Sequence, residues 1–150
     1  MSARDYQRHH EQLSALKGRR AFATLATNSI KLHIDENKKD GTYLWIDPPW
    51  EFYRDDTLVE SSDSYPDDTI PDHGARVQNW FSRFDPIYET AIAEIAATPD
   101  GGLQIQFFGG GEILVPGDNS ERDLWYDHWY YKDPNRPNQT LQPTAGRSDV

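Results

Sequence analysis

The side chains best suited to chemistry in this sequence are carboxylates interleaved with aromatic rings, and they gather in residues 47–73. This segment holds nine acidic residues and one basic residue. Negative charge speeds the encounter with a basic partner, and aromatic rings supply the buried area that holds a complex together. We therefore predict a surface that binds a protein partner with a basic surface. The residues expected to contact that partner are Trp50, Phe52, Tyr53, Asp55, Asp56 and Glu60, followed by Trp125 and Trp129.

A simpler interpretation of the same segment is a solvated loop that keeps the protein soluble. Four prolines interrupt its acidic residues, which favours a long surface loop over regular structure. The aromatic residues at 125–131 also allow two interpretations. Either one face of this segment completes the core, or its rings form a binding surface, and the residue types alone do not decide between the two.

An enzymatic alternative rests on Asp47-Pro48-Pro49-Trp50. This string resembles the motif with which amino-group DNA and RNA methyltransferases hold a flipped adenine, where the aromatic ring stacks on the base. Those enzymes also need a glycine-rich turn before a helix to bind S-adenosylmethionine. Here Gly109-Gly110-Gly111 is followed by the β-like Glu112–Val115, which predicts a hairpin turn. The purely structural interpretation of the motif is a strand that ends at two prolines.

Other catalytic and metal-binding patterns are missing from the sequence. Its five histidines have no dense ligand spacing, and without cysteine there is no thiol nucleophile and no thiolate metal site. Patterns of the nucleophile-elbow and phosphate-loop type are absent too. We expect a protein without catalytic residues, metal or cofactor.

Charge and composition narrow the partners further. The 150 residues include 15 basic and 25 acidic side chains, a formal charge of −10, which repels nucleic-acid backbones and anionic bilayers. No apolar run approaches the roughly 20 residues of a membrane span, and the N-terminal residues lack the apolar stretch of a secretory signal. We expect no nucleic acid, no membrane and a cytoplasmic location, with which the lack of cysteine agrees.

Hydrophobic periodicity predicts the elements that position these residues. Alternating apolar residues predict two similar groups of strands, in residues 21–46 and 90–115, and a helix precedes each group. The expected fold is α+β: a mostly antiparallel six-stranded sheet from a duplicated helix plus three-strand meander, with two helices packed on it. Residues 90–97 are ambiguous, because their alanines also favour a helix.

The corresponding domain plan is a single α+β domain over residues 1–133. Its possible repeats are residues 1–47 and 74–116, with the acidic loop 47–73 between them. Residues 134–150 are punctuated by prolines and hold no large apolar cluster, so we predict a disordered tail.

Several of these segments resemble an uncharacterised bacterial family of small duplicated α+β proteins, some of them immunity-protein-like, from toxin systems. The resemblance covers about residues 13–130. It rests on Leu16–Arg20, on Gly41–Ile46 with the following proline and aromatic residue, on Gly102–Phe107 with Gly110-Gly111, on Val115-Pro116 and on residues 121–125. It implies the duplicated fold and, for the function, neutralisation of a basic toxin domain.

Removal of residues 134–150 is expected to leave folding intact. The tail has too few apolar side chains to offset the roughly 1 to 2 kcal/mol that ordering each residue costs. In thermal denaturation, a chain that ends at Asp133 should melt within a few degrees of the full chain. A larger fall in Tm would show that the tail packs against the domain.

Overall fold

The computed structural model describes residues 11–36, 40–84, 87, 89–98, 101–116 and 129–134. They include residues 11–14 in helical conformation, the 3-10 helix η1 (Ser62–Ser64) and the helix α2 (His73–Ser82). The strands are β1 (Arg20–Ala26), β2 (Ser29–Ile34), β3 (Tyr43–Ile46), β4 (Glu51–Arg54), β5 (Thr57–Ser61), β6 (Thr90–Ala97), β7 (Leu103–Phe107), β8 (Gly111–Val115) and β9 (Trp129–Lys132).

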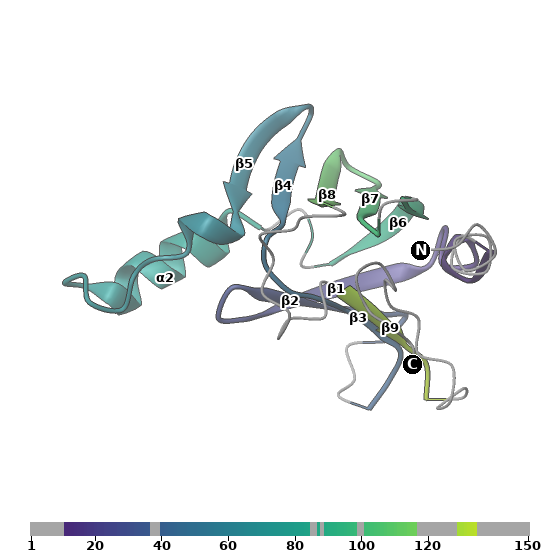
Figure 1. The fold of residues 1–150 in the computed structure, drawn as a ribbon, viewed down its shortest axis with the longest axis horizontal. Helices are drawn as coiled ribbons and strands as arrows, with labels where there is room; N and C mark the ends of the chain where they lie inside the picture. Colours follow the sequence, from purple (N-terminus) through teal and green to yellow (C-terminus); the bar gives the residue numbers. More distant parts are fainter. Residues whose placement is uncertain are drawn as a thin grey trace.

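The predicted α+β fold with a mostly antiparallel sheet is confirmed, but the sheet has nine described strands and not six. Their order is β5-β4-β8-β7-β6-β1-β2-β3-β9 (Figure 1). The three unpredicted strands are β4, β5 and β9. Residues 90–97, ambiguous in the sequence, form β6.

Part of the predicted acidic loop 47–73 is the β4–β5 hairpin. Asp55 and Asp56 form its two-residue turn and have φ of 49° and 66°. Positive φ at both turn residues is the geometry that matches the twist of two paired strands. Aspartate tolerates this conformation better than most residues do, so a pair of acidic residues here closes a hairpin. The loop prediction was therefore wrong for residues 51–61.

The meanders β1-β2-β3 and β6-β7-β8 pair their strands in the same way. Ile30 lies opposite Ile46 in the first meander, as Leu103 lies opposite Val115 in the second. The next inward pairs, Leu32 with Leu44 and Ile105 with Ile113, also correspond. Strands β1 and β6 join the two meanders through a short antiparallel contact at Arg20 and Ala91.

The strand that follows each meander pairs with the other meander. Strand β4 follows β3 in the chain but pairs with β8, and β9 follows β8 but pairs with β3. Each crossing strand is anchored by an indole. Trp50 Nε1, next to β4, donates to the carbonyl of Asn28 at 2.7 Å, and Trp129 Nε1 on β9 donates to the carbonyl of Gly101 at 3.0 Å. Each acceptor lies in the first turn of the meander that the crossing strand follows in the chain, and not of the meander with which it pairs.

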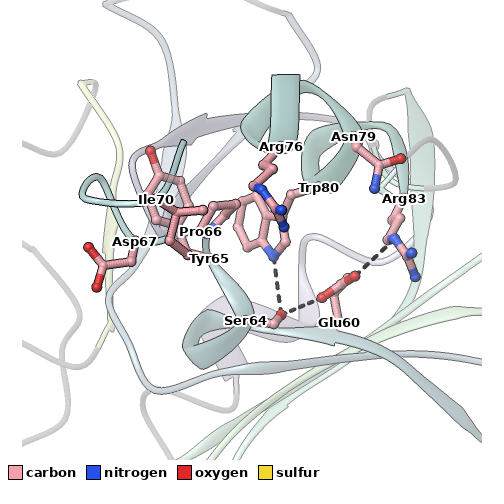
Figure 2. Close-up of a pocket in the computed structure, with 10 residues that line it drawn as sticks. All are labelled: Glu60, Ser64, Tyr65, Pro66, Asp67, Ile70, Arg76, Asn79, Trp80 and Arg83. Carbon is pink, nitrogen blue, oxygen red and sulfur yellow. Dashed lines mark hydrogen bonds and ion pairs between the residues drawn. The ribbon is translucent and has the colours of Figure 1, made fainter. Parts of the chain in front are cut away.

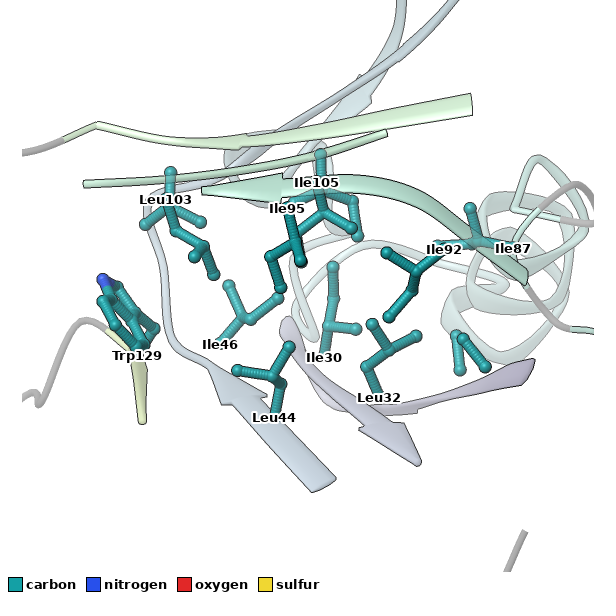
Figure 3. Close-up of a cluster of buried hydrophobic side chains, with 14 of the residues drawn as sticks. Ile30, Leu32, Leu44, Ile46, Ile87, Ile92, Ile95, Leu103, Ile105 and Trp129 are labelled. Carbon is teal, nitrogen blue, oxygen red and sulfur yellow. The ribbon is translucent and has the colours of Figure 1, made fainter. Parts of the chain in front are cut away.

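The core lies between the two halves of the folded sheet. Figure 3 shows Ile30, Leu32, Leu44 and Ile46 pointing toward Ile92, Ile95, Leu103 and Ile105, and all eight are buried. Period-two alternation brings these side chains to one face of each half.

The helices complete this core at its margins instead of forming a layer on the sheet. Leu13 and Leu16 are fully buried next to β1 in the chain, whereas α2 lies beside the β4–β5 hairpin (Figure 1). Trp80 on α2 and Phe84, two residues after its end, are buried. The remaining residues of the predicted first helix and of the tail from residue 135 lie outside the described residues. No described helix has the length and apolar character needed to cross a membrane.

Replacement of either anchoring indole by phenylalanine is expected to destabilise the protein. Trp50→Phe and Trp129→Phe each remove ring volume from the core and a hydrogen bond to a turn carbonyl, so each should cost about 1 to 3 kcal/mol in chemical denaturation. Trp45→Phe is the control, because this half-buried indole on the outer face of β3 donates to the Asp47 carboxylate and not to a turn carbonyl. If Trp50→Phe and Trp129→Phe cost no more than Trp45→Phe, the indoles do not secure the crossing strands.

Candidate protein-binding surface

Three of the predicted partner-contacting residues belong to the core. Trp50, Phe52 and Trp129 are fully buried, so a partner at the surface does not touch them in this fold. Phe52 lies opposite Ile113 and points inward with it, because residues opposite each other in a sheet share a face. These three assignments are corrected accordingly. Trp125 lies outside the described residues.

Tyr53 faces outward in the middle of a continuous row of side chains. Its neighbours across the strands are Leu58 on β5 and Glu112 on β8. Glu51, two residues earlier on β4, has the same orientation. The row continues from Glu112 to Gln106 on β7 and Glu94 on β6. We call this row the acidic face, and it consists of Glu51, Tyr53, Leu58, Glu94, Gln106 and Glu112.

The electrostatics of Tyr53 reflect this placement. The pKa of its phenol is raised by desolvation and then by Glu51, through its charge and a hydrogen bond, and by the Glu112 carboxylate. Neighbouring negative charge disfavours a phenolate, so the ring stays neutral between two carboxylates. A neutral aromatic ring flanked by carboxylates is suited to bind the cation of an arginine or lysine side chain.

Glu112 is held in position by amides of the neighbouring strand. Gln104 Nε2 and Gln106 Nε2 donate to Glu112 Oε2 at 3.1 Å and 2.8 Å. At the far end of the row, Glu94 forms an ion pair with Lys17 at 2.7 Å. Beside Tyr53, the Leu58 side chain is half exposed and adds apolar area to the acidic face.

Asp55 and Asp56 extend the negative charge to the tip of the hairpin, where both are exposed. The Asp55 N–H donates to the carbonyl of Gly110 at 3.1 Å, which ties the β4–β5 turn to the β7–β8 turn. Gly110 has φ of +99°, and a Cβ there would lie 2.6 Å from Asp55 Oδ1. Only glycine fits between these two turns without displacing the carboxylate. Phe108 in the same turn is the most exposed large hydrophobic residue described, at 61%.

Glu60 lies on the other side of the hairpin from Tyr53. It is opposite Phe52 across the β-bulge and its side chain is 11% exposed. One carboxylate oxygen accepts from Arg83 Nε at 3.0 Å and the other accepts from the Ser64 hydroxyl (Figure 2). The Trp80 indole also donates to Ser64, at 3.1 Å. The charge of Glu60 is thus matched inside the protein, whereas Glu51 and Glu112 of the acidic face form no ion pair with the described residues.

Sequence reasoning missed Leu58, Glu51 and Glu112 as parts of one surface. A signal for Glu112 was present in β8, where Ile113 and Val115 alternate inward and therefore leave residue 112 outward. Its proximity to Tyr53 depends on the pairing of β4 with β8, which no local pattern predicts.

The Asp47-Pro-Pro-Trp50 motif has a structural role in this fold. Asp47 Oδ1 accepts hydrogen bonds from Trp45 Nε1 at 2.7 Å and from the Ser29 hydroxyl at 3.0 Å. Trp50 is buried and therefore has no face open to a base. The three glycines at 109–111 lie in the β7–β8 turn and at the start of β8, as the sequence predicted.

No cluster of three or more His, Asp or Glu side chains suited to a metal ion occurs within the described ranges.

Comparison of the chain with protein-family models, with curated proteins and with solved structures finds no match.

The aromatic cluster under the β4–β5 hairpin predicts a severe effect of Trp80→Ala. The Trp80 ring centroid lies 4.7 Å from that of Phe84, 5.1 Å from that of Tyr65 and 5.9 Å from that of Trp50. Removal of this ring should cost about 3 to 5 kcal/mol, measured by denaturant unfolding. The control is Ile70→Ala, since Ile70 is 37% exposed nearby and should cost under about 1 kcal/mol. Equal costs would contradict the central position given to Trp80.

Proposed function

We propose that this chain is a non-catalytic binding protein that captures a basic protein partner on its acidic face, in the manner of an immunity protein that neutralises a basic toxin domain. The observation that carries the proposal is the row Leu58-Tyr53-Glu112, in which an outward aromatic ring lies between an apolar side chain and a carboxylate. Glu51 adds a second carboxylate beside the same ring.

The chemistry of this row suits an arginine or lysine of the partner. A guanidinium or ammonium group over the Tyr53 ring would interact with the face of the ring and with both carboxylates. Leu58 would contact the aliphatic stem of such a side chain. Asp55 and Asp56 at the hairpin tip add charge that attracts a basic partner before contact is made.

The corresponding outward positions in the other half of the sheet are not acidic, which supports the assignment of partner binding to the acidic face and not to its counterpart. Where Tyr53 lies opposite Glu112, the matching pair in the other half is Lys132 opposite Tyr43. The inward residues of the two halves are alike and the outward residues differ in charge. We take the common pairing as the result of an internal duplication, after which one outer face became acidic.

A cytoplasmic site of action completes the proposal, in agreement with a chain that contains no cysteine.

Two alternatives are a structural or ligand-binding domain without such a partner and a methyltransferase-like protein. Burial of Trp50 and the hydrogen bonds to Asp47 count against the second. Calorimetric titration with S-adenosylmethionine is expected to give no heat of binding, and saturable heat would favour the enzyme.

The binding test uses the partner retained by the full chain in a pull-down from its native host. Glu51→Gln combined with Glu112→Gln should slow association and flatten its salt dependence, because exposed charge is screened beyond about 8 Å at physiological salt. Tyr53→Ala should mainly accelerate dissociation, by about 30-fold if the ring is worth about 2 kcal/mol. Stopped-flow or surface-based kinetics separate these rates.

The matched control is Glu36→Gln, an exposed carboxylate that follows β2 outside the acidic face. It should leave both rates near those of the unmodified chain, and none of the variants should lower Tm by more than a few degrees. Capture by the acidic face would be contradicted if the Glu51→Gln and Glu112→Gln double variant associated as fast as the unmodified chain. An equal fall in the association rate of the Glu36→Gln control would contradict it as well.

A further inference from the structure

A groove of about 450 Å³ lies between α2 and the segment that runs from β5 to Ile70 (Figure 2). Its helical wall carries residues spaced by three, four and seven positions, so that they share one face of α2 and its C-cap: Arg76, Asn79, Trp80 and Arg83. The opposite wall is partly apolar and is formed by Tyr65, Pro66 and Ile70, with Ser64, Glu60 and Asp67 at its polar positions.

Both carboxylates of the groove already have partners. Glu60 is bound by Arg83 and Ser64. Asp67 Oδ1 accepts from the Thr69 N–H and from the Thr69 hydroxyl, each at 2.9 Å, and these bonds lower the pKa of Asp67. Within the described ranges, the Arg76 side chain forms no ion pair. The groove therefore contains one cation whose counter-charge these residues do not supply, although the surrounding segment is strongly acidic.

We propose that this groove binds an organic carboxylate with an apolar body, such as an arylalkanoic acid or the C-terminus of a peptide that ends in a large apolar residue. The Arg76 guanidinium presents the donors that match a carboxylate, and the Asn79 amide lies one turn away on the same face. Tyr65, Pro66 and Ile70 form the wall against which the apolar body packs. The groove volume lies within the range of small-ligand sites, about 300 to 1,000 Å³.

A single negative charge fits this groove better than a phosphate does. A dianion would gain from Arg76 but would also lie near the carboxylates of Glu60 and Asp67, which line the same space. A ligand with a single negative charge balances the charge of Arg76, the groove cation that forms no ion pair with the described residues. The apolar wall favours a ligand with few other polar groups. This site is independent of the acidic face, because Glu60 and Tyr53 point to opposite sides of the hairpin.

The test is a titration of the full chain with 3-phenylpropionate, followed by isothermal calorimetry or ligand-observed NMR. Saturable binding is expected, and the neutral analogue 3-phenylpropanamide should bind at least about tenfold more weakly, because it lacks the charge that Arg76 pairs with. Arg76→Gln should weaken binding of the acid by a similar factor and leave the weak binding of the amide unchanged. Arg54→Gln is the control, since Arg54 is exposed at the end of β4 and is not among the groove-lining residues.

Two peptide probes distinguish the sources of the carboxylate. An acetylated Ala-Ala-Phe with a free C-terminus should compete with 3-phenylpropionate if the groove takes peptide ends, and its amidated form should not. Absence of saturable binding by both acids, equal binding of acid and amide, or equal effects of Arg76→Gln and Arg54→Gln would each overturn the proposal. A melting curve of every variant shows that the fold is retained. Failure here leaves the acidic face untouched, because its test uses different residues and a basic partner.

Discussion

The arrangement of this protein depends on the exchange of one strand between the two halves of its sheet. A meander of three strands has two open edges, and here the chain closes an edge of each meander with the strand that follows the other one. The indoles of Trp50 and Trp129 secure the exchange, because each donates a hydrogen bond to the first turn of the meander that its own strand follows in the chain. Pairing of β4 with β8 is the consequence that matters for function, since it alone brings Tyr53 next to Glu112.

Strand alternation then divides the sequence into two sets of residues under different constraints. Inward side chains must fill the space between the half-sheets without voids, because protein interiors are closely packed. The buried Ile30 and Leu32 of the first meander therefore correspond to residues of similar size in the second, Leu103 and Ile105. Outward positions meet no such requirement. The acidic row on one half and the row of Lys132 and Tyr43 on the other occupy equivalent places in the pairing scheme. Opposite charge on the two outer faces is therefore compatible with one common core.

Sequence periodicity predicted the two meanders and even the correspondence of their inward residues, because alternating Ile and Leu is a strong local signal. It missed the β4–β5 hairpin, whose turn is Asp55-Asp56 instead of the usual glycine-containing pair and whose strands are short and charged. It also assigned Trp50 and Phe52 to the surface. Aromatic residues next to carboxylates look alike in sequence whether they are buried or exposed, and only the contact with Trp80 and Phe84 on and after α2 decides the matter. A candidate site that spans β5, β4 and β8 depends on long-range pairing and lies beyond local patterns.

The distribution of charge around the hairpin connects stability with binding. Nine acidic residues in one segment repel one another in the folded state, and α2 offsets part of this repulsion through the ion pair of Arg83 with Glu60. That ion pair lies on the inner side of the hairpin, next to the aromatic cluster, where it helps to hold α2 against β5. The outer side has carboxylates at Glu51 and Glu112 and no arginine or lysine in the row from Leu58 to Glu94. Matched charge on one side therefore stabilises the hairpin, while Glu51 and Glu112 on the other side, which form no ion pair with the described residues, are left to act on a partner.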